Sequence, residues 1–140
     1  MDSDSKRYDF GTVTDESERE RLRLIYEGRI YNGKECGYDF HSLMWEHREN
    51  GIWKLRKELT QETFEADCIN QRWVSKLHSF DPKTGYAILQ VAEGDAPKGS
   101  HETHYNYSWR KWDLKNNKEV AFMHQCKDPF EPYGTSENGS

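Results

Sequence analysis

Aliphatic side chains are scarce in this sequence. Leu, Ile, Val and Phe together account for 23 of its 140 residues, while charged residues make up 32%. That balance approaches the composition of disordered chains. The sequence also has no run of about 18 apolar residues, so we expect no membrane-spanning helix. Its first ten residues lack the apolar stretch of a secretory signal peptide.

Sequence motifs with a known chemical mechanism are absent as well. We find no Gly-rich phosphate-binding loop, no HExxH zinc motif, no GxSxG nucleophile motif and no zinc-ribbon cysteine spacing. The three cysteines, Cys36, Cys68 and Cys126, are an odd number without a CxxC pair. This usage predicts reduced thiols and a cytoplasmic protein. We expect no cofactor.

The charge of −5 is concentrated at the two ends of the chain. Residues 1–20 carry −4 and residues 127–140 carry −2, so the 106 residues between them carry +1. A domain that binds a nucleic-acid duplex usually presents a basic stripe, because contacts to phosphate supply most of its affinity. We therefore do not expect nucleic acid as a partner.

Aromatic residues are what the sequence has in quantity. It contains 5 Trp, 8 Tyr and 6 Phe, and each can bury roughly 150–250 Å². This content predicts a small folded domain whose core is built from aromatic rather than aliphatic side chains.

Alternating apolar residues and turn signals predict an all-β fold. A strand is indicated from Leu22 to Ile30, and three hairpins follow, with turn centres at Asn50-Gly51, Thr84-Gly85 and Asn116-Asn117. Asp113 is expected to bind the backbone of its own turn. The even spacing of the turns predicts about seven antiparallel strands in a small barrel or a two-layer sandwich.

The ends of the domain follow other patterns. Residues 1–13 show no periodicity and are expected to be irregular. Thr14 and Asp15 followed by Glu18 predict the start of one short helix. We place a single β-rich domain at 14–133 and a mobile polar tail at 134–140. Phe130 and Tyr133 are expected to dock on the domain.

One strand face combines aromatic residues with histidine. Tyr105, Tyr107 and Trp109 alternate along one strand, and a tight loop at 116–117 would place Trp109 opposite His124 and Tyr107 opposite Cys126. Trp45 similarly shares a face with histidines in the first hairpin. Such residues, if they point inward, line a pocket with polar tips.

The histidines leave three interpretations open: hydrogen-bonded core residues, pocket residues or metal ligands. The candidates for metal binding are His41, His47, His78, His104 and His124. His101 and His104 would share a metal only on an irregular backbone, because strand alternation points them to opposite faces.

The opposite face of the same strand carries Arg110 and Trp112. An outward Trp beside an Arg is typical of a protein–protein contact, and it can also serve as a stacking platform. The competing interpretation is that a terminal segment covers Trp112.

Two functional hypotheses follow. The first is a non-catalytic intracellular binding module that uses one of these aromatic-rich faces to bind a partner protein or a small apolar or aromatic ligand. The alternative is a small-barrel enzyme in which His124 acts as general base or metal ligand, helped by Tyr107 or another histidine. A homodimer is compatible with both hypotheses.

Overall fold

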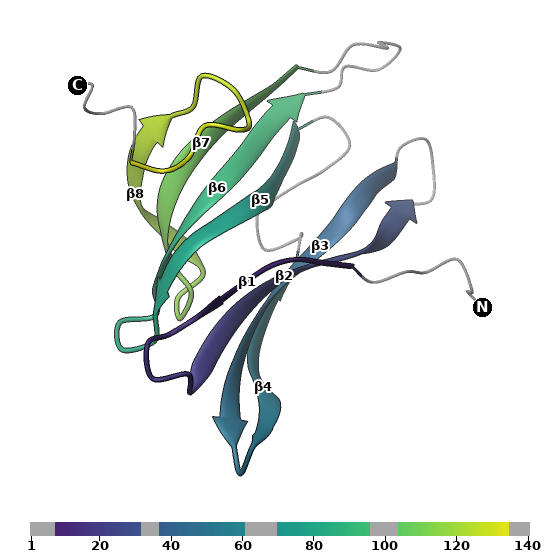
Figure 1. Ribbon diagram of the computed structural model, residues 1–140. Coiled ribbons are helices and arrows are strands. Elements are labelled where there is room, and N and C mark those ends of the chain that lie inside the picture. The colour runs from purple at the N-terminus through teal and green to yellow at the C-terminus, as the bar shows by residue number, and fades with distance from the viewer. Residues whose placement is uncertain (1–7, 32–36, 61–69, 96–103, 135–140) are drawn as a thin grey trace.

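The computed structural model describes residues 8–31, 37–60, 70–95 and 104–134. These residues form two four-stranded antiparallel sheets (Figure 1), and no helix occurs among them. Sheet A contains β1 (Tyr8–Thr14), β2 (Glu20–Tyr31), β3 (Gly37–Glu49) and β4 (Ile52–Thr60). Sheet B contains β5 (Asn70–Asp81), β6 (Tyr86–Asp95), β7 (His104–Asp113) and β8 (Lys118–Gln125).

The two sheets share one hydrophobic core. Strands adjacent in sequence pair in each sheet, and β5 of sheet B contacts β1, β2 and β3 of sheet A. Trp45 of sheet A packs edge-on against Phe80 of sheet B, with ring centroids 5.3 Å apart. The other core residues are Leu22, Leu24, Leu43, Leu59, Val74, Ala87, Leu89, Val91, Trp112 and Leu114. The described strands close no barrel, and the arrangement is consistent with a sandwich.

The three predicted hairpin turns are present. Asn50 and Gly51 both have positive φ, 54° and 80°, which gives the primed two-residue turn that matches strand twist. Gly85 (φ 81°) ends the turn after β5. In the last turn Asn117 has φ 56°, and the Asp113 carboxylate accepts the backbone N–H groups of Lys115 and Asn116.

The predicted N-terminal helix is wrong. Asp15 does organise the local backbone, but its Oδ1 accepts the N–H groups of Arg19 (2.9 Å) and Glu20 (2.8 Å), which closes the loop between β1 and β2. Glu18 takes a positive φ of 59° in that loop. An aspartate satisfies loop donors as well as helix donors, and this segment has no apolar stripe that a helix could bury.

The structure has eight strands where the sequence predicts about seven. The additional strand is β1, which includes residues 8–13 of the segment expected to be irregular. β6 continues to Asp95, although the Gly, Pro, Asp and Ser residues of 92–102 predict a loop there. The rest of 92–102 lies outside the described residues, as do Cys36, Cys68 and most of 60–71, a segment whose sequence is ambiguous between a short helix and an edge strand. In the described part of the chain, no helix has the length and apolar character that a membrane crossing requires.

Candidate functional site

Sheet B has an inner face, which meets sheet A, and an outer face, which points away from it. Strand alternation assigns the side chains. In β7, Trp112 pairs with the core residue Ala87, so Trp112 and Arg110 point inward. Trp109 pairs with Gln90 and points outward together with Tyr107 and Tyr105. The aromatic face predicted from sequence is therefore the outer face of sheet B.

The pairing of β7 with β8 brings two predicted site residues together. Trp109 lies opposite His124, and the Cys126 N–H donates to the Tyr107 carbonyl at 2.8 Å, so both predicted pairings are confirmed. The tight loop is not their cause, because Asp113 pairs with Lys118 around a four-residue loop. Two register shifts along β8 instead restore the predicted alignment.

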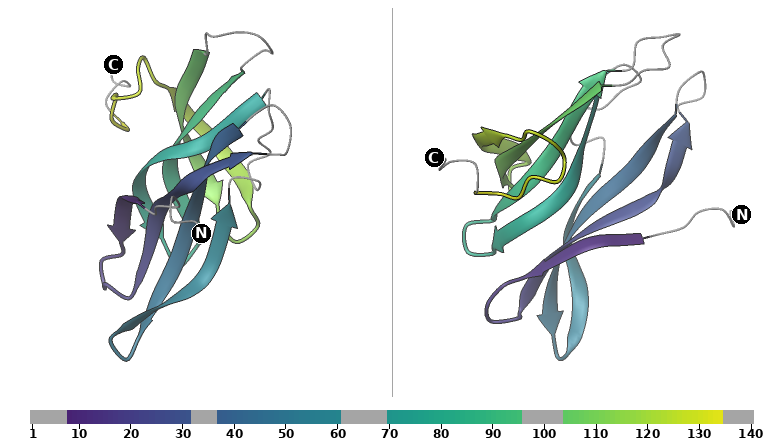
Figure 2. Two further views of the ribbon diagram at one scale, coloured as in Figure 1. Left: turned by 90° about the vertical axis from the view of Figure 1, so that its right-hand side faces the viewer. Right: turned by 45° about the horizontal axis from the view of Figure 1, so that its top comes forward.

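Residues 127–134, which we call the C-terminal arm, cross the outer face of sheet B. Figure 2 (right) shows the arm on the side of sheet B turned away from sheet A. Trp109 points away from the core, and yet it is only 3% exposed. The arm accounts for this burial, because the Trp109 indole N–H donates to the Glu131 carbonyl at 3.1 Å.

Side chains of sheet B hold the main chain of the arm at two further points. The Pro129 carbonyl accepts hydrogen bonds from Lys76 Nζ (2.6 Å) and Gln90 Nε2 (3.3 Å). The Gly134 N–H donates to His124 Nε2 at 3.3 Å. Together with the Trp109 contact, these bonds engage main-chain atoms of three arm residues, Pro129, Glu131 and Gly134.

Tyr133 anchors the end of the arm among three rings of the sheet. Its ring centroid lies 4.7 Å from that of His78, 5.6 Å from that of Trp109 and 5.7 Å from that of His124. The predicted docking of Tyr133 is confirmed. Phe130 instead is 81% exposed, with Lys76 Nζ 5.4 Å from its ring centroid.

The outer face continues beyond the arm contacts. Trp73 of β5 packs edge-on against Tyr105 of β7, with ring centroids 4.7 Å apart. Tyr105 and Tyr107 are partly exposed, in contrast to Trp109. The described aromatic surface is therefore larger than the part that the arm contacts.

The predicted outward orientation of Trp112 is wrong. Trp112 is 3% exposed and belongs to the core between the sheets. Arg110 is 8% exposed and lies on the same inner face. The prediction reversed the two faces because it took the aromatic-rich side as the interior, whereas the arm covers much of that side.

Arg110 is held in a network of alternating charges on the inner face. Its Nη1 and Nη2 bind Glu119 (2.5 Å) and Glu93 (2.9 Å), and its Nε donates to Ser108 (2.7 Å). Arg72 pairs with the same two carboxylates at 3.0 and 3.2 Å. All of the Arg110 nitrogens are thus engaged within sheet B, which makes this network structural.

Trp45 also belongs to the core rather than to the outer face. It is 3% exposed, and its indole N–H donates to Glu20 Oε1 at 2.6 Å. His41 lies on the same face of β3 and packs against Tyr26, with centroids 5.4 Å apart. The structure therefore does not bring Trp45 together with Trp109 and His124.

The metal-binding interpretation receives no support from the described residues, which contain no group of three His, Cys, Asp or Glu side chains able to hold a metal. His101 and the side chain of His104 lie outside the described part. Cys126 is buried, 7% exposed, and burial raises the pKa of its thiol. A thiol in that state is a poor nucleophile.

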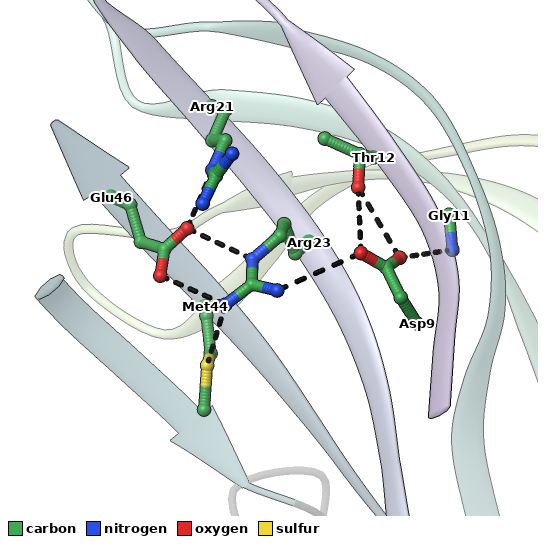
Figure 3. Close-up of polar contacts among 7 residues, drawn as sticks. All are labelled: Asp9, Gly11, Thr12, Arg21, Arg23, Met44 and Glu46. Atoms are coloured by element: carbon green, nitrogen blue, oxygen red, sulfur yellow. Dashed lines mark hydrogen bonds and ion pairs between the residues drawn. The ribbon is translucent and has the colours of Figure 1, made fainter. Parts of the chain in front are cut away.

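The outer face of sheet A carries a second polar cluster (Figure 3). Glu46 Oε1 accepts hydrogen bonds from Arg21 Nε (2.6 Å) and Arg23 Nε (2.9 Å), and its Oε2 accepts from Arg23 Nη2 (3.0 Å). Burial alone would raise the pKa of Glu46, but the hydrogen bonds and charges of the two arginines outweigh it and lower this pKa. Asp9 pairs with Arg23 at 3.6 Å.

Sequence reasoning missed part of the face that holds the arm. Lys76, His78 and Gln90 come from β5 and β6, and their contacts depend on where the arm runs. The one available signal was the combination of proline and aromatic residues in an otherwise polar C-terminus. Comparison with protein-family models, curated proteins and solved structures found no match.

Proposed function

We propose that this protein is a non-catalytic binding module whose site is the outer face of sheet B, and that it binds a short segment of a partner protein. One observation carries the proposal: the face already holds a segment of the chain, the C-terminal arm, through main-chain groups of that segment. Lys76, Gln90 and Trp109 donate to carbonyl groups of the arm, and His124 accepts an arm N–H. Contacts of this kind accept many sequences, because the main chain provides the bonding groups.

The composition of the face supports a protein ligand. Trp, Tyr and His offer large contact areas with a polar edge, at a low cost in side-chain entropy. Trp73 and Tyr105 extend this surface beyond the arm contacts. A partner segment could therefore contact more of the face than the arm does.

The arrangement favours binding over catalysis by His124. The nitrogen that would act as general base, Nε2, accepts the Gly134 N–H, and the Tyr133 ring stacks on the imidazole with an interplanar angle of 23°. The arm thus engages the His124 imidazole, on which the alternative hypothesis of a small-barrel enzyme depends.

Selection from a random peptide library displayed on phage tests the proposal. The targets are the full-length wild-type protein and its Tyr133→Ala variant, in which the arm loses its anchor. We expect peptides to be enriched on the variant and to bind wild type more weakly. Adding Lys76→Ala should weaken them, because Lys76 holds an arm carbonyl. Leu55→Ala, at an exposed position of sheet A, is the matched control.

The proposal is wrong if no peptide is enriched on the folded variant. It is equally wrong if the enriched peptides bind the Lys76→Ala and Leu55→Ala proteins alike, because they would then bind elsewhere.

A further inference from the structure

The arm presents alternate residues to sheet B. The carbonyls of Pro129 and Glu131 and the ring of Tyr133 all contact the outer face. Phe130, between the first two, is 81% exposed. The arm is folded rather than extended, since the Glu131 N–H donates to the Asp128 carbonyl at 3.2 Å and Gly134 has a positive φ of 87°. Within this folded arm, the side chains at positions 131 and 133 contact sheet B.

The Glu131 side chain lies against sheet B despite its charge. It is 11% exposed, and its Oε2 is buried 4.0 Å from Nδ1 of His124. Its Oε1 accepts the Lys127 N–H at 2.5 Å. His124 Nε2 accepts the Gly134 N–H, and Nδ1 lies 3.4 Å from the Gln125 carbonyl. An edge of the His124 ring thus lies beside an acidic side chain.

The Tyr133 ring defines a second position with side-chain selectivity. It lies among the rings of His78, Trp109 and His124, which come from three different strands. A site walled by three rings favours a planar aromatic side chain over an aliphatic one.

From these contacts we infer that the partner segment carries a carboxylate two residues before an aromatic residue, and that it binds by displacing the C-terminal arm. This inference rests on the proposed function. The arm is then an intramolecular competitor that occupies the site until a segment of the same pattern replaces it.

The covalent connection of the arm sets the strength of the competition. The arm follows β8 directly, since Cys126 still bonds to β7 and Lys127 begins the arm. A short tether of this kind gives an effective concentration in the millimolar range. A peptide of the same sequence should therefore bind wild type at least about ten-fold more weakly than a protein whose arm is released.

Fluorescence anisotropy with a labelled peptide spanning residues 127–140 tests the inference. The host is the full-length Tyr133→Ala protein, and wild type is the comparison. We expect the peptide to bind the host, and Tyr133→Ala in the peptide to weaken binding about ten-fold. Glu131→Gln should weaken it by about three-fold or more. Phe130→Ala is the matched control, and it should leave binding unchanged because that ring is exposed.

Each other outcome identifies what is wrong. If library peptides bind the outer face but the arm peptide does not, the proposed function stands and the inferred pattern fails. If Phe130→Ala weakens the peptide as much as Tyr133→Ala, the register is wrong. If neither peptide class binds, both proposals fail. If the Tyr133→Ala protein does not fold, wild type is titrated with each peptide up to millimolar concentration. The affinities of the peptide variants must then rank in the same order, and a different order overturns the inference.

Discussion

Replacing Glu46 by Gln tests the electrostatic account of sheet A. The carboxylate accepts three hydrogen bonds from Arg21 and Arg23, at 2.6, 2.9 and 3.0 Å. Its side chain is 10% exposed, while those of the arginines are 23% and 25% exposed. A hydrogen bond to a charged group contributes about 1.5–3 kcal/mol when well shielded. Because solvent reaches both arginines, we expect Glu46→Gln to lower the free energy of unfolding by about 1–2 kcal/mol at neutral pH.

The effect should depend on pH with a definite sign. The pKa of Glu46 is lowered in the folded protein relative to its ordinary value of 4.5. A depressed pKa adds stability above the pKa of the unfolded chain, and this stability is lost as pH falls toward the folded value. The difference between wild type and Glu46→Gln should therefore be constant from neutral pH down to the region of 4.5 and shrink below it.

Urea denaturation followed by tryptophan fluorescence measures this difference at a series of pH values. Urea is preferable to guanidinium chloride, because a salt screens the ion pairs under test. Glu58→Gln is the matched control, since Glu58 is exposed and pairs with Met44 in the same sheet. It should change the free energy of unfolding by less than about 0.5 kcal/mol. A Glu46→Gln difference that stays constant into the acid-unfolding range would refute the reasoning.

Two further predictions concern the turns of sheet A. Asp15→Ala removes the acceptor for two loop N–H groups and should lower the free energy of unfolding by about 1 kcal/mol, whereas Asp15→Asn should lower it less. Urea denaturation measures both changes, and equal losses of stability would contradict a hydrogen-bonding role for Asp15. Gly51→Ala should lower it by about 1 kcal/mol because of the positive φ of 80°. The added Cβ meets no atom within 4 Å, so Gly51→Asn should lower it less than Gly51→Ala, and the reverse order would mean that φ is not the cause.

Local chemistry predicted the hairpins correctly because it depends on few residues. Asn50-Gly51 adopts the two positive φ values that the turn requires, and Asp113 binds the N–H groups of its own loop. These interactions form within four residues of sequence. No distant part of the chain is needed to specify them.

The N-terminus could not be predicted in the same way. Asp15 satisfies backbone donors in a hairpin loop as readily as in a helix, so its capping chemistry does not choose between them. The pairing of β1 with β2, in which Val13 lies opposite Leu22, selects the hairpin loop over the helix. Val13 then packs against the core, a gain that short-range patterns around residue 15 do not reveal.

Strand alternation predicted which residues of β7 share a face, but not which of the two faces points outward. Alternation along β7 correctly grouped Tyr105, Tyr107 and Trp109 and separated them from Arg110 and Trp112. Which of these two groups faces sheet A depends on how the two sheets pack, and the sequence of a single strand does not determine that packing. The misleading signal was aromatic content, because Trp109 is as deeply buried as Trp112, each 3% exposed.

The reason for this equal burial also explains where a binding site can lie. Trp112 is buried by the second sheet, a cover that cannot leave without unfolding the core. Trp109 is buried by an eight-residue arm whose contacts include main-chain hydrogen bonds and one anchoring ring, Tyr133. Local opening of such a segment costs far less than global unfolding. Under the proposed function, Trp109 is therefore the tryptophan that a partner reaches, and displacement of Tyr133 is the step that exposes it.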